Sequence, residues 1–269
     1  MTQAEHTIDD SIDHLLVISD IHGFKRPLDA FDKIRETYAD SYQIICNGDL
    51  CCGGLDVPYV LDWLKSNVGQ LSTLGNHDDC LLQGGDPNSL PGKEAYDFLQ
   101  LNQSQLDYLG NMPHSLQLKW RGHDIHLTHG HITRDEGTGS WRATPDEQIA
   151  SLADPDADLC ISSHTHFSFI DHGKSGIYAN TGSLAATING IREKGVVHYQ
   201  CGDREIGDKE DRRPSFLDVT CEDGKLNVAI IRLEYDHQAA AQELEDGGHH
   251  DPDVYRNWLA EGIYTISTS

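Results

Sequence analysis

Five short segments of the sequence place carboxylate, amide and imidazole groups directly after apolar, β-branched stretches. They are Asp20-Ile21-His22, Gly48-Asp49, Gly75-Asn76-His77-Asp78, His129-Gly130-His131 and Ser163-His164-Thr165-His166. One such segment alone is weak evidence for a site, because Asp, Asn and Gly favour turns and helix caps for local reasons. All five together, with oxygen and imidazole donors and no thiolate, are typical of a site for borderline divalent metals such as Mn²⁺, Fe²⁺, Ni²⁺ or Zn²⁺.

The elements around the first three segments predict how they come together. Apolar runs predict strands at 15–19, 43–46 and 71–74, and helical patterns opened by proline predict helices at 27–38 and 58–67. This β-α-β-α-β order indicates a parallel sheet with right-handed crossovers, in which ligands gather beyond the carboxyl ends of the strands. We therefore expect the polar segments to lie side by side at one sheet edge.

The rest of the chain predicts further layers. Residues 80–113 have the pattern of a polar helical insertion beside the site, with helices near Tyr96 and Leu106. Strands are expected at 115–120, 123–127, 159–162, 167–171, 177–179, 196–199, 216–219 and 226–233, and a helix at 146–152. So many strands predict an α/β fold of two stacked mixed β-sheets flanked by helices. We expect one domain over residues 1–236 and an acidic C-terminal appendage over 237–269, with a short helix at 254–259.

Composition narrows the class of partner and the compartment. The formal net charge of −24 disfavours duplex nucleic acid as a partner, although a protein from a high-salt cytoplasm shows the same acidic excess. No stretch has the length that spans a bilayer, and the first residues lack the pattern of a signal peptide. The seven cysteines form no disulfide framework, so we expect a cytoplasmic protein without a membrane partner. Cysteines near the proposed site fit no ferredoxin spacing, and packing is their expected role.

As a set, the five segments resemble the sequence blocks of the calcineurin-like metallophosphoesterases. Those blocks read D-x-H, G-D, G-N-H-D, H-G-H and G-H-x-H, in the order found here, and the resemblance spans about residues 12–235. It implies a four-layer αββα sandwich that holds two divalent metal ions. It also implies the activity of a metal-dependent phosphoric ester hydrolase.

The resemblance further implies a role for each matching residue. The ligands would be Asp20, His22 and His166 for one metal, Asp49 as the bridge, and Asn76, His129 and His164 for the other. His77 would lie beside the metals without binding them, and Asp78 would support His77. In the implied reaction, a hydroxide that bridges the metals attacks phosphorus in line, and protonated His77 gives its proton to the departing oxygen.

The implied substrates are small phosphodiesters, phosphomonoesters or nucleotides, because a centre with residual positive charge attracts a phosphate ester even inside an acidic protein. A nuclease of the same superfamily and a metal-binding scaffold without catalysis stay open as alternatives. The oligomeric state does not follow from the sequence.

The chain departs from the family pattern at several positions. Ser163 stands where the family has glycine. Gly48-Asp49 is followed by Leu50-Cys51-Cys52 and not by the Asp-Arg-Gly of protein serine/threonine phosphatases, which disfavours that activity. The segment "ANTGS" that ends at Ser183 resembles the Asn-Pro-Gly-Ser turn of small phosphodiesterase-like members, with Thr181 in place of proline.

Overall fold

Two large β-sheets form the centre of the molecule. The computed structural model describes residues 2–39, 41–84, 97–130, 142–173, 176–202, 211–248 and 252–265. The five-stranded sheet has the order β13 (Lys225–Arg232), β12 (Ser215–Glu222), β2 (His14–Ile18), β3 (Tyr42–Asn47) and β4 (Ser72–Thr73). The six-stranded sheet has the order β1 (Gln3–Thr7), β5 (Ser115–Trp120), β6 (His123–Thr128), β7 (Leu159–Ser162), β9 (Ile177–Asn180) and β8 (Phe169–His172). Both sheets mix parallel and antiparallel pairs.

The two sheets stack against each other through apolar side chains. Leu15 and Val17 of β2 lie in one buried cluster with Leu116 of β5 and Leu127 of β6. Leu16 of β2 belongs to the cluster on the opposite face, as the two-residue period of a strand requires. Because β2 is buried on both faces from Leu15 onward, its sequence after His14 is apolar and does not alternate.

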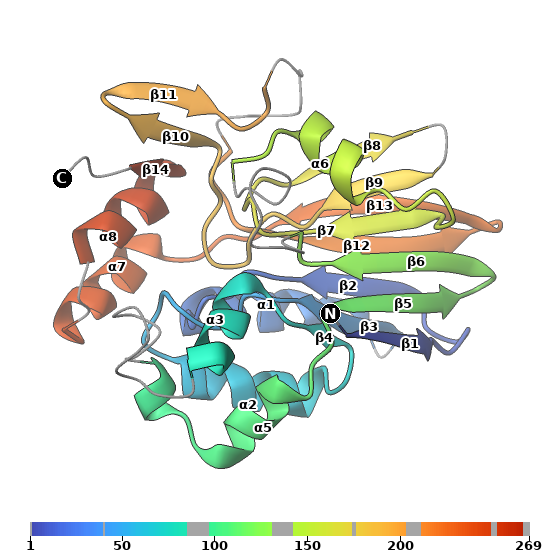
Figure 1. The fold of residues 1–269 in the computed structure, drawn as a ribbon, viewed down its shortest axis with the longest axis horizontal. Helices are drawn as coiled ribbons and strands as arrows, with labels where there is room; N and C mark the ends of the chain where they lie inside the picture. The colour runs from blue at the N-terminus through green and yellow to red at the C-terminus, as the bar shows by residue number, and fades with distance from the viewer. Residues whose placement is uncertain are drawn as a thin grey trace.

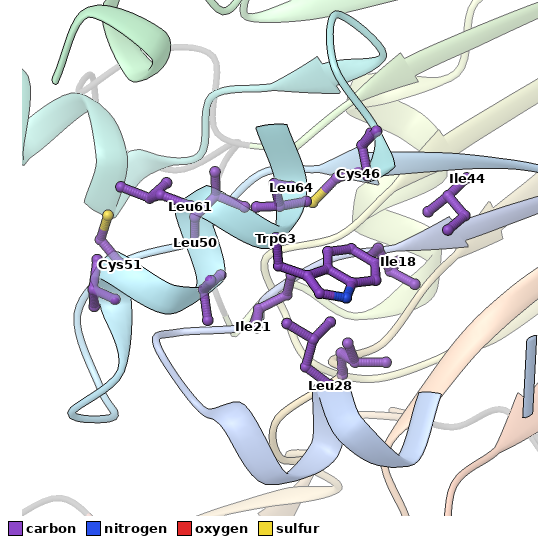
Figure 2. Packing of buried hydrophobic residues seen from close by; sticks show 14 of the residues in the cluster. Ile18, Ile21, Leu28, Ile44, Cys46, Leu50, Cys51, Leu61, Trp63 and Leu64 are labelled. Carbon is purple, nitrogen blue, oxygen red and sulfur yellow. The ribbon is translucent and has the colours of Figure 1, made fainter. Parts of the chain in front are cut away.

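Helices α1 (Lys25–Arg35) and α2 (Val57–Asn67) cover the outer face of the five-stranded sheet. They connect β2, β3 and β4, which run parallel, so the predicted β-α-β-α-β order is confirmed. The end of the predicted first helix is the 3₁₀ turn η1 (Glu36–Tyr38). Figure 2 shows Leu28 of α1 and Trp63 of α2 in the buried cluster that contains Ile18 and Ile44 of the sheet.

Helix α6 (Pro145–Leu152) covers the other large sheet. Its Ile149 packs against a small buried cluster that contains Phe169 of β8 and Tyr178 of β9. Figure 1 shows α6 on one side of the strands and α2 on the opposite side. The layers are therefore helix, sheet, sheet and helix, and the predicted fold of two stacked mixed sheets flanked by helices is confirmed.

The predicted helical insertion at 80–113 contains the end of α3 (Asn76–Gly84), a helical stretch at 97–100 and α5 (Gln103–Gly110). The predicted helix near Tyr96 lies partly outside the described residues. Helix α5 begins with a capping box at Asn102, and the Gln105 amide donates hydrogen bonds to the Pro58 carbonyl and the Asp62 carboxylate of α2. The insertion therefore packs on α2 as a continuation of the helical layer.

The C-terminal elements pack against the rest of the chain. Helix α7 (His237–Asp246) and α8 (Pro252–Glu261) precede β14 (Ile263–Thr265), which joins β10 (Gly190–Glu193) and β11 (Val196–Tyr199) in a three-stranded sheet. Figure 1 shows these elements together at one end of the two large sheets. Their buried cluster joins Leu244 and Trp258 to Phe24 and Ala185. The domain boundary at residue 236 stays a prediction, but the segment beyond it shares a core with the residues before it.

Several elements were not predicted. They are β1, β10, β14, α3 and α7. β1 has the polar sequence QAEHT and β10 is only four residues long, so neither carries a periodic apolar signal. The predicted strand at 167–171 begins at Phe169, and the predicted strand at 71–74 has only two residues.

The cysteines near the strand exits serve the core. Cys46, Cys51 and Cys52 are buried in the cluster beneath α1 and α2, and Figure 2 shows the first two among its apolar side chains. Burial raises the pKa of the Cys46 and Cys51 thiols well above the ordinary value, which agrees with a packing role for these buried side chains. Among the described residues, no helix has the length and apolar character needed to cross a bilayer.

Candidate metal centre

The polar segments converge at the carboxyl ends of neighbouring strands. The predicted ligand atoms of Asp20, His22 and His166 lie within 4.8 Å of one another. Those of Asp49, His129 and His164 form a second group within the same limit. These groups contain six of the seven predicted ligands, and a third group joins Asp49 to His22 and His77, so Asp49 lies beside both of the ligand sets that the resemblance implies.

The remaining predicted ligand, Asn76, begins α3 directly after β4 and lines the same cavity as His22 and Asp49. Its side-chain oxygen is buried. The structure therefore brings all the predicted ligands to one place, while their binding of metal stays a prediction.

Most of the candidate ligands have a strained backbone. Positive φ angles occur at Asp20 (50°), His22 (50°), Asp49 (55°), His164 (71°) and His166 (58°). Residues other than glycine rarely adopt this left-handed conformation, which costs on the order of 1–3 kcal/mol each and persists only where the surroundings enforce it. The strain is concentrated where the strands end, so the fold holds these side chains in place at the expense of local stability.

Two glycines allow the loops of the centre to approach closely. A Cβ atom on Gly75 would lie 2.1 Å from Oδ1 of Asp49, and one on Gly48 would lie 2.6 Å from the Gly75 nitrogen and 2.8 Å from Nδ1 of His129. Gly48 also has a φ of 83°, which favours glycine. The Gly-Asp and Gly-Asn segments therefore need glycine because their backbones touch each other.

Backbone carbonyls orient three of the imidazoles. The accepting atoms are the Cys51 carbonyl for His22 Nδ1 (2.9 Å), the Ala186 carbonyl for His166 Nδ1 (2.9 Å) and the Asn47 carbonyl for His129 Nδ1 (2.7 Å). A carbonyl only accepts, so each Nδ1 carries the proton. When neutral, each ring then presents the lone pair of Nε2 to the centre, which is how metal-binding histidines are usually held.

Several buried donor atoms at the centre lack a protein partner that suits them. The Nε2 atoms of His22 and His166 are 3.1 Å apart, although in these tautomers both are acceptors. Within the described residues, Asn76 Oδ1 is buried without a hydrogen bond. Nε2 of His166 lies 3.1 Å from Asp20 Oδ1, and Nε2 of His129 lies 3.2 Å from Asp49 Oδ2, but a neutral ring in these tautomers has no proton on Nε2 to donate. Leaving such atoms unsatisfied is costly, and a cation between them would satisfy them. The donor set therefore fits divalent metal.

The electrostatics of the centre favour ionised carboxylates. Burial alone would raise the pKa of Asp49, but the charges of His129 and His77 outweigh burial and hold this pKa well below its ordinary value. Burial lowers the pKa of His22 to about 3, so this imidazole is neutral at pH 7. Burial opposes protonation of His129 too, but the charges of Asp49 and Asp20 raise its pKa to about 10. A metal ion must therefore displace a proton from His129.

The hydrogen bonds of the Asp78 carboxylate join two loops, while its support of His77 stays a prediction. Its carboxylate accepts hydrogen bonds from the backbone N–H groups of Leu50 (3.0 Å), Cys51 (3.1 Å) and Gly75 (3.0 Å). Burial, followed by the charge of Asp49, raises the pKa of Asp78 to about 6. Asp78 thus joins the loop after β3 to the loop after β4, which together carry the bridging candidate and Asn76.

His77 lies at the edge of the centre. Its backbone N–H donates to Oδ1 of Asp49 (3.0 Å), its ring centroid is 5.3 Å from that of His22, and it lines the cavity. Its imidazole also lies within the 4.8 Å grouping of His22 and Asp49. This position suits a proton donor to a substrate. The His77 imidazole also lies close enough to the candidate ligands to bind a metal ion, and a measurement of metal content separates the two roles.

Two departures from the family pattern contact each other. Oγ of Ser163 lies 2.8 Å from Oγ1 of Thr181 and accepts a hydrogen bond from the Asn47 amide (2.7 Å). Thr181 also lies 2.6 Å from Oγ of Ser19 at the end of β2. Glycine and proline at these two positions would lack all these hydroxyl contacts. The two hydroxyl residues thus link the ends of β2, β3, β7 and β9 with side-chain hydrogen bonds.

A cavity of about 370 Å³ opens beside the predicted ligands. The sequence did not predict three of its lining residues, Tyr255 and Trp258 of α8 and Tyr264 of β14. The sequence did contain a signal for two of them: the three-residue spacing of Tyr255 and Trp258 places both rings on one face of a helix. His131, the last residue of the fourth polar segment, lies outside the described residues.

Comparisons with known proteins agree with the geometry. Residues 14–168 match the family model of the calcineurin-like phosphoesterases. The fold is similar to that of a metallophosphoesterase from Sphaerobacter thermophilus, with 20% sequence identity and a TM-score of 0.66 over 94% of this chain and 100% of that chain. A hypothetical protein from Pyrococcus horikoshii OT3 is similar too, with 17% identity and a TM-score of 0.64 over 93% of this chain and 98% of that chain. No curated protein sequence matches the chain.

Proposed function

This chain belongs to the calcineurin-like phosphoesterase family, and from that premise we propose that it hydrolyses small phosphodiesters, phosphomonoesters or nucleotides at a centre of two divalent metal ions. The observation that carries the proposal is the convergence of buried imidazole nitrogens and carboxylate oxygens at the strand exits, in groups whose atoms lie within 4.8 Å of one another. Neutral Nε2 atoms face carboxylate oxygens and each other in these groups, and such atoms repel unless a cation lies between them.

The residues that would hold the metals divide into two sets that share Asp49. Mn²⁺, Fe²⁺, Ni²⁺ or Zn²⁺ all accept the imidazole, carboxylate and amide donors present. Divalent cations held there would lower the pKa of a coordinated water and stabilise negative charge on the phosphoryl group. The chain itself contributes the fixed Nε2 lone pairs, the carboxylates and a cavity beside them.

His77 is the proposed proton donor. Hydrolysis forms one bond from water oxygen to phosphorus and breaks the ester bond, and the departing oxygen must take up a proton. His77 lines the cavity that would hold the ester, and its backbone is tied to Asp49. A general acid in this position typically contributes about 10²- to 10⁴-fold when the leaving group is a poor one.

The net charge of the chain favours small substrates over nucleic acid. A net charge of −24 repels a duplex over a large surface, whereas one ester group experiences mainly the local field of the metals. We also propose a cytoplasmic location, which the seven free cysteines support because disulfides persist in oxidising compartments.

The test begins with removal of metal by chelation and reloading with each cation in turn. We expect bis(p-nitrophenyl) phosphate to be hydrolysed after reloading and duplex DNA to stay intact. Asp49→Asn should lose most of one metal per chain, because a carboxamide bridges cations poorly. Its turnover should fall at least about 10²-fold, since metals supply several kcal/mol and each ~1.36 kcal/mol is tenfold in rate.

Asp124→Asn is the matched control, because the Asp124 side chain is 58% exposed in a surface pair with Lys119. It should retain the metal content and turnover of the parent. Elemental analysis showing two metals in Asp49→Asn, together with normal turnover, would contradict the dinuclear centre. Efficient duplex cleavage at physiological salt would instead favour the nuclease alternative.

A further inference from the structure

The cavity beside the metal centre has two unlike walls. One wall carries the candidate ligands His22, Asp49 and His166, and the other carries Tyr255, Trp258 and Tyr264 from the C-terminal segment. We propose that these three aromatic residues, called the aromatic wall below, bind a planar heteroaromatic group of the substrate, so that the preferred ester is a nucleoside monophosphate. This inference rests on the proposed phosphoesterase function and adds the substrate class.

The aromatic wall is continuous with the metal centre. The ring centroid of Trp258 lies 5.1 Å from that of His166, 5.6 Å from that of Tyr255 and 5.9 Å from that of Tyr264. A phosphoryl group at the metals would therefore place the rest of a compact ester beside these rings. A cavity of about 370 Å³ is within the range of sites that hold one small organic molecule.

The aromatic wall is also held rigidly. The Trp258 indole N–H donates to the carbonyl of Thr187 (3.2 Å), and the preceding residue, Ala186, accepts the hydrogen bond from His166 Nδ1. β14, which carries Tyr264, pairs in parallel with β10. One backbone loop thus connects the aromatic wall to a candidate ligand, and such preorganisation reduces the entropy that binding would cost.

The chemistry of the aromatic wall selects the class of ligand. No lysine or arginine occurs among the described residues that line the cavity, and the lining away from the candidate ligands consists of the aromatic wall and Ile188. Stacking of a base on an aromatic side chain is typically worth about 1–3 kcal/mol. A ligand with a phosphoryl group at one end and a nucleobase at the other matches both walls.

Adenosine 5′-monophosphate and ribose 5-phosphate provide a direct test. Both release a primary alcohol from the same phosphoryl group, so they differ only in the base. We expect kcat/KM for the nucleotide to exceed that for the sugar phosphate by about 10- to 100-fold, the range that stacking of one base supplies. Equal values in the metal-loaded parent protein would overturn the inference and leave the proposed function intact.

Variants then assign the preference to the aromatic wall. Tyr264→Ala should reduce the ratio of the two kcat/KM values toward one, and Tyr264→Phe should retain it because the ring is kept. Tyr199→Ala is the matched control, since Tyr199 lies on β11 of the same small sheet, is 42% exposed and does not line the cavity. An unchanged ratio in Tyr264→Ala and in a second variant, Trp258→Leu, both with parental thermal melting, would contradict the role of the wall.

A binding measurement separates this inference from the proposed function. Adenosine and ribose contain no phosphate, so their binding to the metal-loaded protein can be followed by calorimetry without hydrolysis. Adenosine should bind at least about tenfold more tightly than ribose, and Tyr264→Ala should remove the difference. If no phosphoester is hydrolysed, the proposed function fails. The binding comparison still decides the aromatic wall, because equal affinities refute it.

Discussion

His77 occupies a position that is compatible with two different roles. Its imidazole lies near both His22 and Asp49, so geometry permits a proton donor and a metal ligand alike. The sequence distinguishes His77 from the ligands only through its place in the Gly-Asn-His-Asp segment. Metal content and the dependence of the hydrolysis rate on the leaving group differ between the two roles, so measuring both separates a proton donor from a metal ligand.

His77→Ala should leave the metal content unchanged and slow esters with poor leaving groups. A p-nitrophenolate departs with little help, so bis(p-nitrophenyl) phosphate should lose little activity. A nucleoside monophosphate must release an alkoxide and should lose about 10²- to 10⁴-fold in kcat. Steady-state kinetics on both esters, with elemental analysis of the same samples, measures the effect.

His198→Ala, which removes an exposed imidazole on β11, is the control and should behave as the parent. Loss of a metal from His77→Ala would indicate a ligand. Equal losses for the two esters with full metal content would indicate substrate positioning and would refute the donor role.

At the scale of elements, the loops that follow the strands position the candidate ligands. Each segment leaves a buried strand and turns at once, and five of the candidate ligands adopt positive φ to do so. The loops after β3 and β4 meet without space between Gly75 and Asp49, and Asp78 ties them together through backbone N–H groups. The positions of the ligands therefore depend on how closely these two loops approach.

Gly75→Ala should disrupt the centre without unfolding the protein. The added methyl group would lie 2.1 Å from Oδ1 and 2.3 Å from the backbone nitrogen of Asp49, so the loop after β3 must move. A displacement of about 1 Å at a catalytic centre can cost on the order of 10² in rate. Turnover of bis(p-nitrophenyl) phosphate and metal content should both fall, as kinetics and elemental analysis would show.

Gly110→Ala is the matched control, because a Cβ atom on Gly110 at the end of α5 would meet no atom within 4 Å among the described residues. Its turnover and melting temperature should stay at or slightly above the parental values. Normal turnover in Gly75→Ala would show that the loops can separate without cost to the centre.

At the scale of the whole molecule, charge has an effect that no single contact reveals. Forty-four acidic side chains face twenty basic ones in a compact chain of 269 residues. Like charges at this density repel one another and oppose the folded state. Surface ion pairs, such as that of Arg26 with Glu243, neutralise only some of the acidic side chains.

The melting temperature should therefore rise with ionic strength. Between about 0.05 M and 1 M salt the Debye length falls to about 3 Å, so repulsion between surface carboxylates is screened. Relief of ~1 kcal/mol would raise the melting temperature by about 2–4 °C in a chain of this size. Calorimetry with excess divalent metal, repeated in KCl and NaCl, measures the change. A flat or falling melting temperature in both salts would refute self-repulsion as a limit on stability.

The sequence by itself determined the β-α-β-α-β order of the first strands and helices and the segments that carry the candidate ligands, because both follow from patterns within a few residues. Only the tertiary structure showed the contact of Ser163 with Thr181, the part Asp78 takes in joining two loops, and the place of Trp258 beside His166. These features depend on backbone positions brought together from distant parts of the chain. Local propensity and periodicity depend only on residues that are close in sequence. They therefore could not reveal that the predicted appendage packs against the site through a core shared with Phe24 and Ala185.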